Sequence, residues 1–272
     1  FAKNNPDSTF DVEKYAQGQM PKSANSNPDM KLAYLNGHFG YFQKCIISTN
    51  ALGVVRNVNF YDADNNLEKD LRPQDIKDSY DAKSLIPSLE TYFQLHPNFS
   101  YKYFLGDAGF DADDNYAYLH QKNIMPIISL NPRNSPSLPQ PGFNEVGVPL
   151  CPNDSSLPMI YDGITREKGR ADRIKYICPK AKKINVKGKI SYILNCENPC
   201  TNSKCGRIKQ ITIHHNYRFN SSIPRDSLKW QKLYKLRTIC ERSICQIKNF
   251  IQLKSSRVRN TVSLKSDILL AC

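Results

Sequence analysis

The sequence has 272 residues, 40% of them hydrophobic and 23% charged, which is the composition of an ordinary globular protein with one substantial core and a smaller subdomain. The net charge of +13 is uneven, because residues 1–150 carry 13 Lys and Arg against 17 Asp and Glu, whereas residues 151–272 carry 25 against 8. This asymmetry indicates a polyanionic partner, and nucleic acid is favoured over a membrane surface because no predicted helix pairs a basic face with a broad apolar face. No apolar run approaches the roughly 18 residues of a membrane-spanning helix, so we expect no membrane partner and a soluble, cytoplasmic protein.

The first part of the chain changes from a polar segment to predicted β-structure. Residues 1–37 are rich in Asn, Pro, Ser and Lys and show no strand period, so we expect an extended connecting segment. From His38, two β-rich runs flank the turn sequence TNALG, which predicts a β-hairpin. A helix is expected over Ser84–His96, with apolar residues every four positions from Leu85 and with Pro87 in its first turn.

A strand, a helix and a second strand are then predicted in close succession. Tyr101–Leu105 is expected to be the first strand, and Ile124–Leu130 the second. Asp111 or Asp113 is a candidate N-cap for the helix between them, which we expect to end near Lys122. This order predicts a βαβ unit with parallel strands.

Asp107 follows the first of these strands, in the sequence GDAGFD. Open α/β sheets place their chemistry at the carboxyl ends of their strands, so Asp107 is a candidate functional residue. The alternative is a turn-forming Asp that caps the helix after it.

The region after the second of these strands has a different composition. Pro, Ser and Gly dominate to about residue 160, and short basic β-like runs such as RIKYICP and IKQITIHH then alternate with turns. We therefore expect four segments: an extended segment (1–37), the first part of the core (38–133), a β-rich basic insertion (134–222), and a core helix with a basic tail (223–272).

One amphipathic helix is predicted over Lys229–Gln252. At about 100° per residue, its apolar residues fall in one stripe roughly 80° wide, and this stripe must face a core: Leu233, Leu236, Cys240, Ile244, Ile247 and Ile251. A second stripe, about 60° wide, contains Tyr234, Arg237, Glu241 and Lys248. A carboxylate beside two cations and a phenol suits a metal ion next to a bound anion, while the alternative is an exposed face with ordinary ion pairs.

The spacing Tyr-x2-Arg-x3-Glu-x6-Lys at 234–248, together with GDAGFD and NPRN at 131–134, resembles the DDE transposases of bacterial insertion sequences. The order of elements resembles that group too, in particular the β-rich insertion before the helix that carries Glu241. The resemblance covers the chain from about Lys31 to its end. It implies an α/β fold of the ribonuclease-H-like type, a mixed sheet flanked by helices, with the β-rich insertion before the last core helix.

The resemblance also implies an activity, which is DNA strand cleavage and transfer with Mg2+ or Mn2+. Asp107 and Glu241 would be catalytic metal ligands, since hard divalent cations prefer carboxylate oxygens. Arg237 and Lys248 would contact DNA phosphates, and Tyr234 would position the strand end. The implied partners are the terminal inverted repeats of the element, target DNA, and a second copy of the chain in a homodimer.

One part of the family pattern has no match. The family's first catalytic aspartate lies on a strand before the hairpin, but the acids before His38 lie in polar surroundings: Asp7, Asp11, Glu13 and Asp29. We therefore expect an amino-terminally truncated transposase whose first acid lies upstream of Phe1. The alternative function is a catalytically inactive remnant that still binds DNA.

The cysteines suggest a second metal. Nine cysteines, an odd number in a chain of this kind, indicate reduced thiols or metal ligands rather than a disulfide framework. Four are candidate zinc ligands in the insertion, with Cys151 or His214 and His215 as substitutes: Cys178, Cys196, Cys200 and Cys205. Their spacing lacks the paired C-x2-C of common zinc ribbons, so ordinary thiols are the alternative. A third hypothesis is a zinc-stabilised nucleic-acid-binding module without nuclease ancestry.

Overall fold

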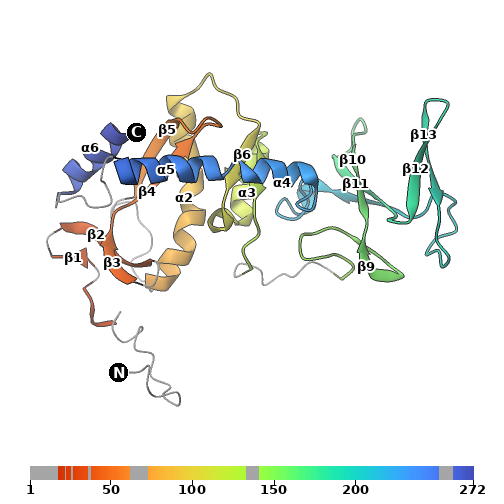
Figure 1. Ribbon diagram of the computed structural model, residues 1–272, viewed down its shortest axis with the longest axis horizontal. Helices are drawn as coiled ribbons and strands as arrows, with labels where there is room; N and C mark the ends of the chain where they lie inside the picture. Colours follow the sequence, from red (N-terminus) through yellow and green to blue (C-terminus); the bar gives the residue numbers. More distant parts are fainter. Residues whose placement is uncertain are drawn as a thin grey trace, which may run out of the picture. The chain divides into compact units, whose positions relative to one another are not determined.

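The computed structural model describes residues 18–21, 23–25, 27–35, 38–61, 73–132, 141–250 and 260–272. They form a mixed α/β structure with small sheets and several helices (Figure 1). The chain divides into a first unit, Phe1–Leu95 with Thr238–Cys272, and a second unit, His96–Arg237. Within the described ranges, no helix has the length and apolar character needed to cross a membrane. The four-segment division made from the sequence stays a prediction.

The first unit begins with a sheet that the sequence does not predict. Strand β2 (Asn27–Leu35) pairs antiparallel with β3 (His38–Phe42) on one side and with β1 (Ser23–Ala24) on the other. The expectation of an extended segment without strands is therefore wrong for Asn27–Leu35. Strand formation depends on pairing with neighbouring strands more than on local preference. The polar sequence around β2 therefore gives no sign that this segment pairs with β3.

The predicted hairpin is confirmed as β4 (Lys44–Thr49) and β5 (Val55–Tyr61), which pair antiparallel. Asn50 closes its turn, because its Oδ1 accepts hydrogen bonds from the backbone N–H groups of Leu52 and Val54 at 2.9 and 3.0 Å. Side-chain amides of this kind commonly stabilise turns.

Helix α2 (Pro73–Leu95) is longer than the sequence predicts. It begins at Pro73, a residue that is favoured in the first turn of a helix because its missing N–H needs no partner there. Pro87 consequently lies inside the helix and not in its first turn. The helix buries Leu85 and Leu89, and Ser88 Oγ donates a hydrogen bond to the Asn59 side chain of β5 at 3.2 Å.

Two further helices complete the first unit. Helix α5 (Thr238–Phe250) packs along β4 and buries Ile247 (Figure 1). Helix α6 (Thr261–Ala271) starts at the N-cap Asn260, whose side chain accepts two backbone hydrogen bonds. The Thr261 hydroxyl donates to the buried Asn27 side chain at 2.8 Å, which ties α6 to β2.

The second unit contains the predicted βαβ unit. Strands β6 (Tyr103–Gly106) and β7 (Met125–Ile128) are parallel, and α3 (Asp113–Gln121) connects them. The N-cap of α3 is Ala112, so the prediction of Asp111 or Asp113 at that position is wrong. Asp111 is instead buried in an ion pair, as described below.

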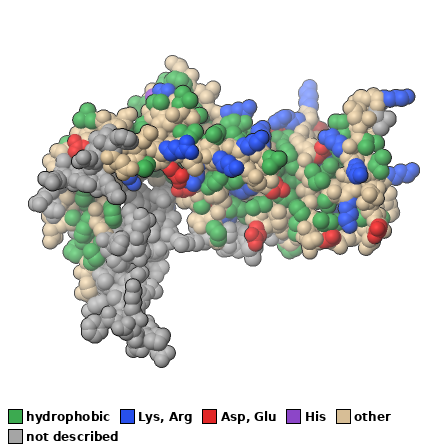
Figure 2. All heavy atoms as spheres, in the orientation of Figure 1, with side chains coloured by type: hydrophobic (Ala, Val, Ile, Leu, Met, Phe, Trp, Pro, Cys, Tyr) green, Lys and Arg blue, Asp and Glu red, His purple; other side chains and the backbone are tan. Residues whose placement is uncertain are grey.

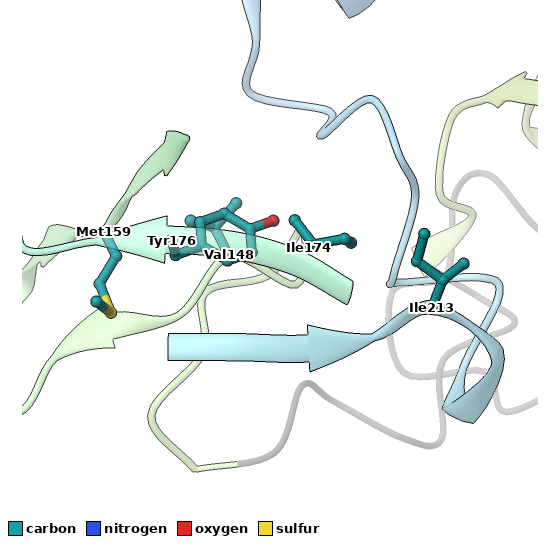
Figure 3. Close-up of a cluster of buried hydrophobic side chains, with 5 residues drawn as sticks. All are labelled: Val148, Met159, Ile174, Tyr176 and Ile213. Carbon is teal, nitrogen blue, oxygen red and sulfur yellow. The ribbon is translucent and has the colours of Figure 1, made fainter. Parts of the chain in front are cut away.

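The predicted β-rich region is also present. It contains strands β8 (Leu150–Cys151), β9 (Asp154–Pro158), β10 (Ile160–Thr165), β11 (Arg173–Ile177), β12 (Ala181–Val186), β13 (Lys189–Leu194) and β14 (Ile208–Thr212). Strands β10, β11 and β14 form one antiparallel sheet, and β12 with β13 a separate hairpin. Figure 3 shows the small core beside this sheet: Val148, Met159, Ile174, Tyr176 and Ile213.

The single helix predicted over Lys229–Gln252 is two helices, α4 (Leu228–Lys235) and α5, and the predicted positions Ile251 and Gln252 lie outside the described residues. The backbone tightens at the break, where the N–H groups of Leu236 and Arg237 bond to carbonyls three residues earlier. No Gly or Pro causes this break. Helix α4 packs against β7 of its own unit, the second, and α5 packs against β4 of its own unit, the first. The break therefore lies where the chain passes from one unit to the other, and packing within each unit outweighs the local preference for one continuous helix.

Candidate active site

Asp107 lies where the sequence predicts it, directly after β6. Gly106 pairs with Ile128 in the parallel ladder, so Asp107 and Ser129 are the first residues beyond the paired ends of two neighbouring strands. The carboxylate is exposed, and its Oδ1 accepts a hydrogen bond from the Gly109 N–H at 2.9 Å. Asp107 therefore caps the 3₁₀ turn Ala108–Phe110, and its second oxygen makes no hydrogen bond within the described residues.

Tyr234 reaches the same edge of the β6–β7 pair from α4. Its hydroxyl lies 3.0 Å from Ser129 Oγ, within hydrogen-bonding distance. Its ring stacks on that of Trp230, with centroids 4.6 Å apart and an interplanar angle of 13°. Trp230 is 9% exposed and packs with the β7 residue Ile127, so the tyrosine is held on a buried platform. Asp107 and Tyr234, far apart in the sequence, thus belong to one sheet edge.

Arg237 follows Tyr234 on the same chain segment, and its guanidinium lies 5.4 Å from the centroid of the Tyr234 ring. This is within the range of a cation–π contact. The outward face of α4 is basic as well, because Lys229, Lys232 and Lys235 are exposed. A cationic helix face therefore adjoins the tyrosine.

Glu241 and Lys248 lie on α5, in the first unit, and both are exposed. Glu241 is in the first turn of the helix and Lys248 in its last turn, the positions at which the helix dipole favours an acid and a base. Asp107, Tyr234 and Arg237 thus belong to the second unit, whereas Glu241 and Lys248 belong to the first.

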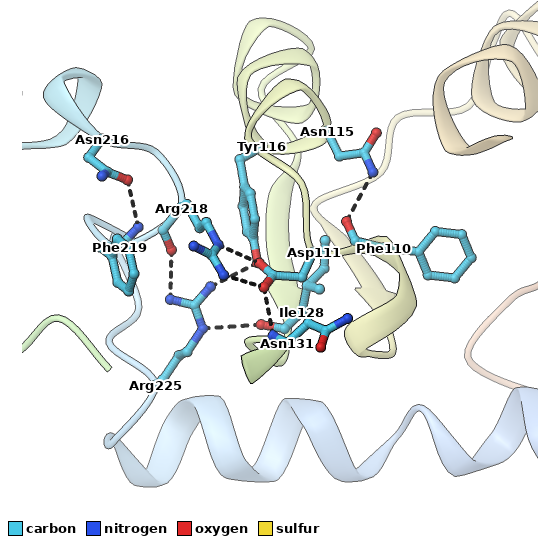
Figure 4. Close-up of polar contacts among 10 residues, drawn as sticks. All are labelled: Phe110, Asp111, Asn115, Tyr116, Ile128, Asn131, Asn216, Arg218, Phe219 and Arg225. Carbon is cyan, nitrogen blue, oxygen red and sulfur yellow. Dashed lines mark hydrogen bonds and ion pairs between the residues drawn. The ribbon is translucent and has the colours of Figure 1, made fainter. Parts of the chain in front are cut away.

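A buried ion pair joins Asp111, four residues after Asp107, to Arg218 (Figure 4). The Arg218 guanidinium donates from Nε to Asp111 Oδ1 at 2.9 Å and from Nη2 to Asp111 Oδ2 at 2.7 Å. The two side chains are 4% and 0% exposed. The Tyr116 hydroxyl and the Asn131 N–H donate to the same carboxylate at 2.8 and 2.6 Å, so both of its oxygens are satisfied.

Arg225 extends this network to the end of β7. Its Nε donates to the Ile128 carbonyl at 3.1 Å, Nη1 to the Arg218 carbonyl at 2.7 Å, and Nη2 to the Tyr116 hydroxyl at 2.9 Å. The network therefore holds the segments that follow β6 and β7, which carry Asp107 and Ser129.

The electrostatics of the pair follow from its geometry. Burial by itself raises the pKa of Asp111, but the hydrogen bonds from Arg218, Asn131 and Tyr116 outweigh it, and the pKa lies below its ordinary value. The bond to Asp111 raises the pKa of Arg218, and burial raises that of Tyr116. Asp111 is therefore a carboxylate held by a fixed cation, which suits a structural role.

The local sequence does not predict this network. It indicates only a helix cap at Asp111, which is the second acid of GDAGFD. Arg218 lies 107 residues after Asp111, and no local pattern links the two. The sequence does contain a hint, because Arg218 and Arg225 stand among apolar and small polar residues in NYRFNSSIPRD, where buried cations need partners.

The cysteines of the insertion form no disulfide. Cys178 is buried, whereas Cys196, Cys200 and Cys205 are half-buried. A Cβ atom on Gly206 would lie 2.9 Å from Cys178 Cβ, so the segment that carries Cys205 passes against Cys178. Within the described ranges, no group of three or more His, Cys, Asp or Glu side chains is arranged to hold a metal ion. The zinc site stays a prediction.

Figure 2 shows Lys and Arg side chains along α4 and at the free end of the β12–β13 hairpin. Both places belong to the strongly basic second half of the chain.

In comparisons with protein-family models, curated proteins and solved structures, no match to this chain was found.

Proposed function

We propose that this chain is a DDE transposase that cleaves and transfers DNA strands at the ends of an insertion sequence with the help of a divalent metal ion. The observation that carries the proposal is the convergence of Asp107 and Tyr234 on one sheet edge, through the Tyr234–Ser129 contact. The parallel β6–α3–β7 unit and the β4–β5 hairpin support a ribonuclease-H-like fold. The Tyr-x2-Arg-x3-Glu-x6-Lys spacing supports the family.

Asp107 fits a metal ligand chemically. It is an exposed carboxylate at a strand end, and one of its oxygens makes no hydrogen bond within the described part of the chain. Mg2+ prefers such oxygens and is commonly held by one or two carboxylates. Asp107 and Glu241 would hold the ion, which would supply charge stabilisation at the phosphodiester. The basic groups Arg237 and Lys248 would bind neighbouring phosphates, and Tyr234 would orient the strand end.

The proposed partners are the terminal inverted repeats, target DNA and a second copy of the chain. The exposed cations of α4 support a phosphate-binding role near Tyr234, because they lie on the helix that carries Tyr234 and precede Arg237 in the chain.

The second candidate is a catalytically inactive remnant that binds the same DNA. The observation that favours it is the cap formed by Asp107, since a carboxylate already bonded to Gly109 has a structural role without a metal. The two candidates share the basic surface and differ only in catalysis.

The test is metal-dependent nicking of a supercoiled plasmid by the full chain in Mg2+ or Mn2+. Asp107→Asn and Glu241→Gln are each expected to reduce nicking by about 10²-fold or more, as for other losses of charge stabilisation. Asp114→Asn, which removes an exposed acid from α3, is the matched control and should nick like the parent chain. Nicking that survives both substitutions would remove Asp107 and Glu241 from the mechanism. DNA binding without any nicking would support the remnant.

A further inference from the structure

The β12–β13 hairpin is the most uniformly basic element of the insertion. Its 14 residues, from Ala181 to Leu194, include four lysines and no Asp or Glu. The lysines are Lys182, Lys183, Lys187 and Lys189, and all four are exposed. The nearest acid along the chain is Glu197, beyond the end of β13.

One face of the hairpin is anchored to the rest of the insertion. Lys183 and Tyr192 are cross-strand partners, and both bind the Asp162 carboxylate of β10, the lysine at 2.9 Å. Lys175 of β11 binds the same carboxylate at 2.9 Å, and the Asp162 side chain is only 9% exposed. This cluster fixes the hairpin to the β10–β11–β14 sheet, so Lys183 already has a structural partner.

The opposite face points outward. Cross-strand partners share a face and successive residues alternate between faces, so Lys182, Ile193 and Lys189 lie on the side away from Asp162. Ile193 is 55% exposed there. The outward face therefore presents cations without a neighbouring acid in the hairpin.

The turn adds a third cation at the tip. Lys187 and Gly188 have φ values of 51° and 80° and form the two-residue turn between the strands. Two positive φ angles are typical of a type I′ turn, in which Asn or Gly is preferred at the first position. Lysine is an unfavourable residue for that backbone, and its ammonium group lies at the most remote point of the hairpin.

We propose that the outward face and tip of the β12–β13 hairpin, formed by Lys182, Lys187 and Lys189, bind the phosphate backbone of duplex DNA. The inference deepens the proposed function and rests on it for the choice of polyanion. It assigns the insertion a DNA contact through residues that take no part in the chemistry.

The dimensions of the hairpin suit a DNA groove. Six-residue strands are about 20 Å long, and a two-stranded ribbon enters a major groove about 12 Å wide. Lys182 and Lys189 lie on one face, and their positions are four residue steps apart along the hairpin, roughly 14 Å. Single strands are less suited, because Tyr192, the aromatic ring of the hairpin, faces the anchored side.

The test measures binding of the full chain to a 30-base-pair duplex of mixed sequence by fluorescence anisotropy, without divalent metal, as a function of salt. Each lysine that contacts phosphate contributes about 0.9 to the slope of log K against log salt, so the triple variant Lys182→Gln, Lys187→Gln, Lys189→Gln should lose about 2.7. Its affinity near 0.15 M salt should fall by about tenfold or more. The triple arginine variant should keep the parental slope. The control removes three exposed lysines elsewhere: Lys83→Gln, Lys122→Gln and Lys168→Gln.

The outcomes separate this inference from the proposed function. Loss of slope in the hairpin variant alone, with an unchanged melting curve, supports the hairpin whether or not the chain nicks DNA. An equal loss in both variants, parental binding by the hairpin variant, tighter binding to single-stranded DNA, or no binding by the parent chain would each overturn it. Nicking that depends on Asp107 and Glu241 would then still support the transposase.

Discussion

The guanidinium of Arg218 binds the carboxylate of Asp111 through two hydrogen bonds, at 2.9 and 2.7 Å, and both side chains are buried. The pair joins the segment that follows β14 to the loop that follows β6. It therefore links the position of Asp107 to residues more than 100 positions later in the chain.

Removal of one partner of this pair should be strongly destabilising. Arg218→Met leaves the Asp111 carboxylate buried without its cation, which costs about 3–5 kcal/mol of unfolding free energy. Urea unfolding followed by circular dichroism measures this loss. Arg170→Gln, which breaks the exposed Arg170–Glu167 pair, should change stability by less than about 1 kcal/mol. A comparably small effect of Arg218→Met would show that the pair does not hold the fold.

The Asp162 cluster should make stability depend on pH. Burial raises the pKa of Asp162, but hydrogen bonds from Tyr192, Lys175 and Lys183 lower it to about 2, below its unfolded value of about 3.9. The carboxylate thus stabilises the folded state above about pH 4, and this contribution is lost as the pH falls toward 2. The difference in unfolding free energy between the parent and Asp162→Asn should therefore shrink between pH 5 and about pH 3. A difference that is constant with pH would contradict this assignment, and Glu90→Gln, at an exposed site, is the control.

The hydroxyl contact of Tyr234 can be measured by a double-mutant cycle. Tyr234→Phe keeps the stacking on Trp230 and removes the contact with Ser129, at a cost of about 0.5–1.5 kcal/mol. Ser129→Ala should cost a similar amount, and the double variant should lose less than the sum of the two. Strict additivity in urea unfolding would mean that the two hydroxyl groups do not interact.

Gly53 should tolerate a side chain poorly. Its φ is +83°, and a Cβ atom would lie 2.9 Å from Ser243 Oγ, which itself donates a hydrogen bond to the Gly53 carbonyl at 2.7 Å. Gly53→Ala is expected to cost about 1–2 kcal/mol from the backbone conformation alone, and more from the contact. Gly142→Ala is a matched control, because Gly142 has φ +88° with open space around it. Equal losses of melting temperature in the two variants would exclude a contribution from Ser243.

Much of the local structure could be predicted. The β4–β5 hairpin and the β6–α3–β7 unit follow from short apolar runs separated by turn residues, and both are present. Asp107 at the end of β6 follows from the same pattern. The apolar period of the last long helix is visible as well, although the helix is broken after Lys235.

The candidate site could be predicted only in part. The Tyr-x2-Arg-x3-Glu-x6-Lys spacing, with the family resemblance based on it, predicts Tyr234 and Arg237 as site residues. No such spacing includes the residues that contact or support them: Ser129, Trp230, Arg218 and Arg225. Strand β2 was missed because its partner β3, and not its own composition, makes it a strand.

The sequence by itself determined the local elements, the basic second half of the chain and the acid at the end of β6, because periodicity, turn residues and net charge are properties of neighbouring residues. The tertiary structure decided the partner of Asp111, the contact of Tyr234 with Ser129, and the break between α4 and α5. These depend on packing between segments that are distant in the chain, and the free energy of such packing exceeds the small local preferences that a sequence reveals.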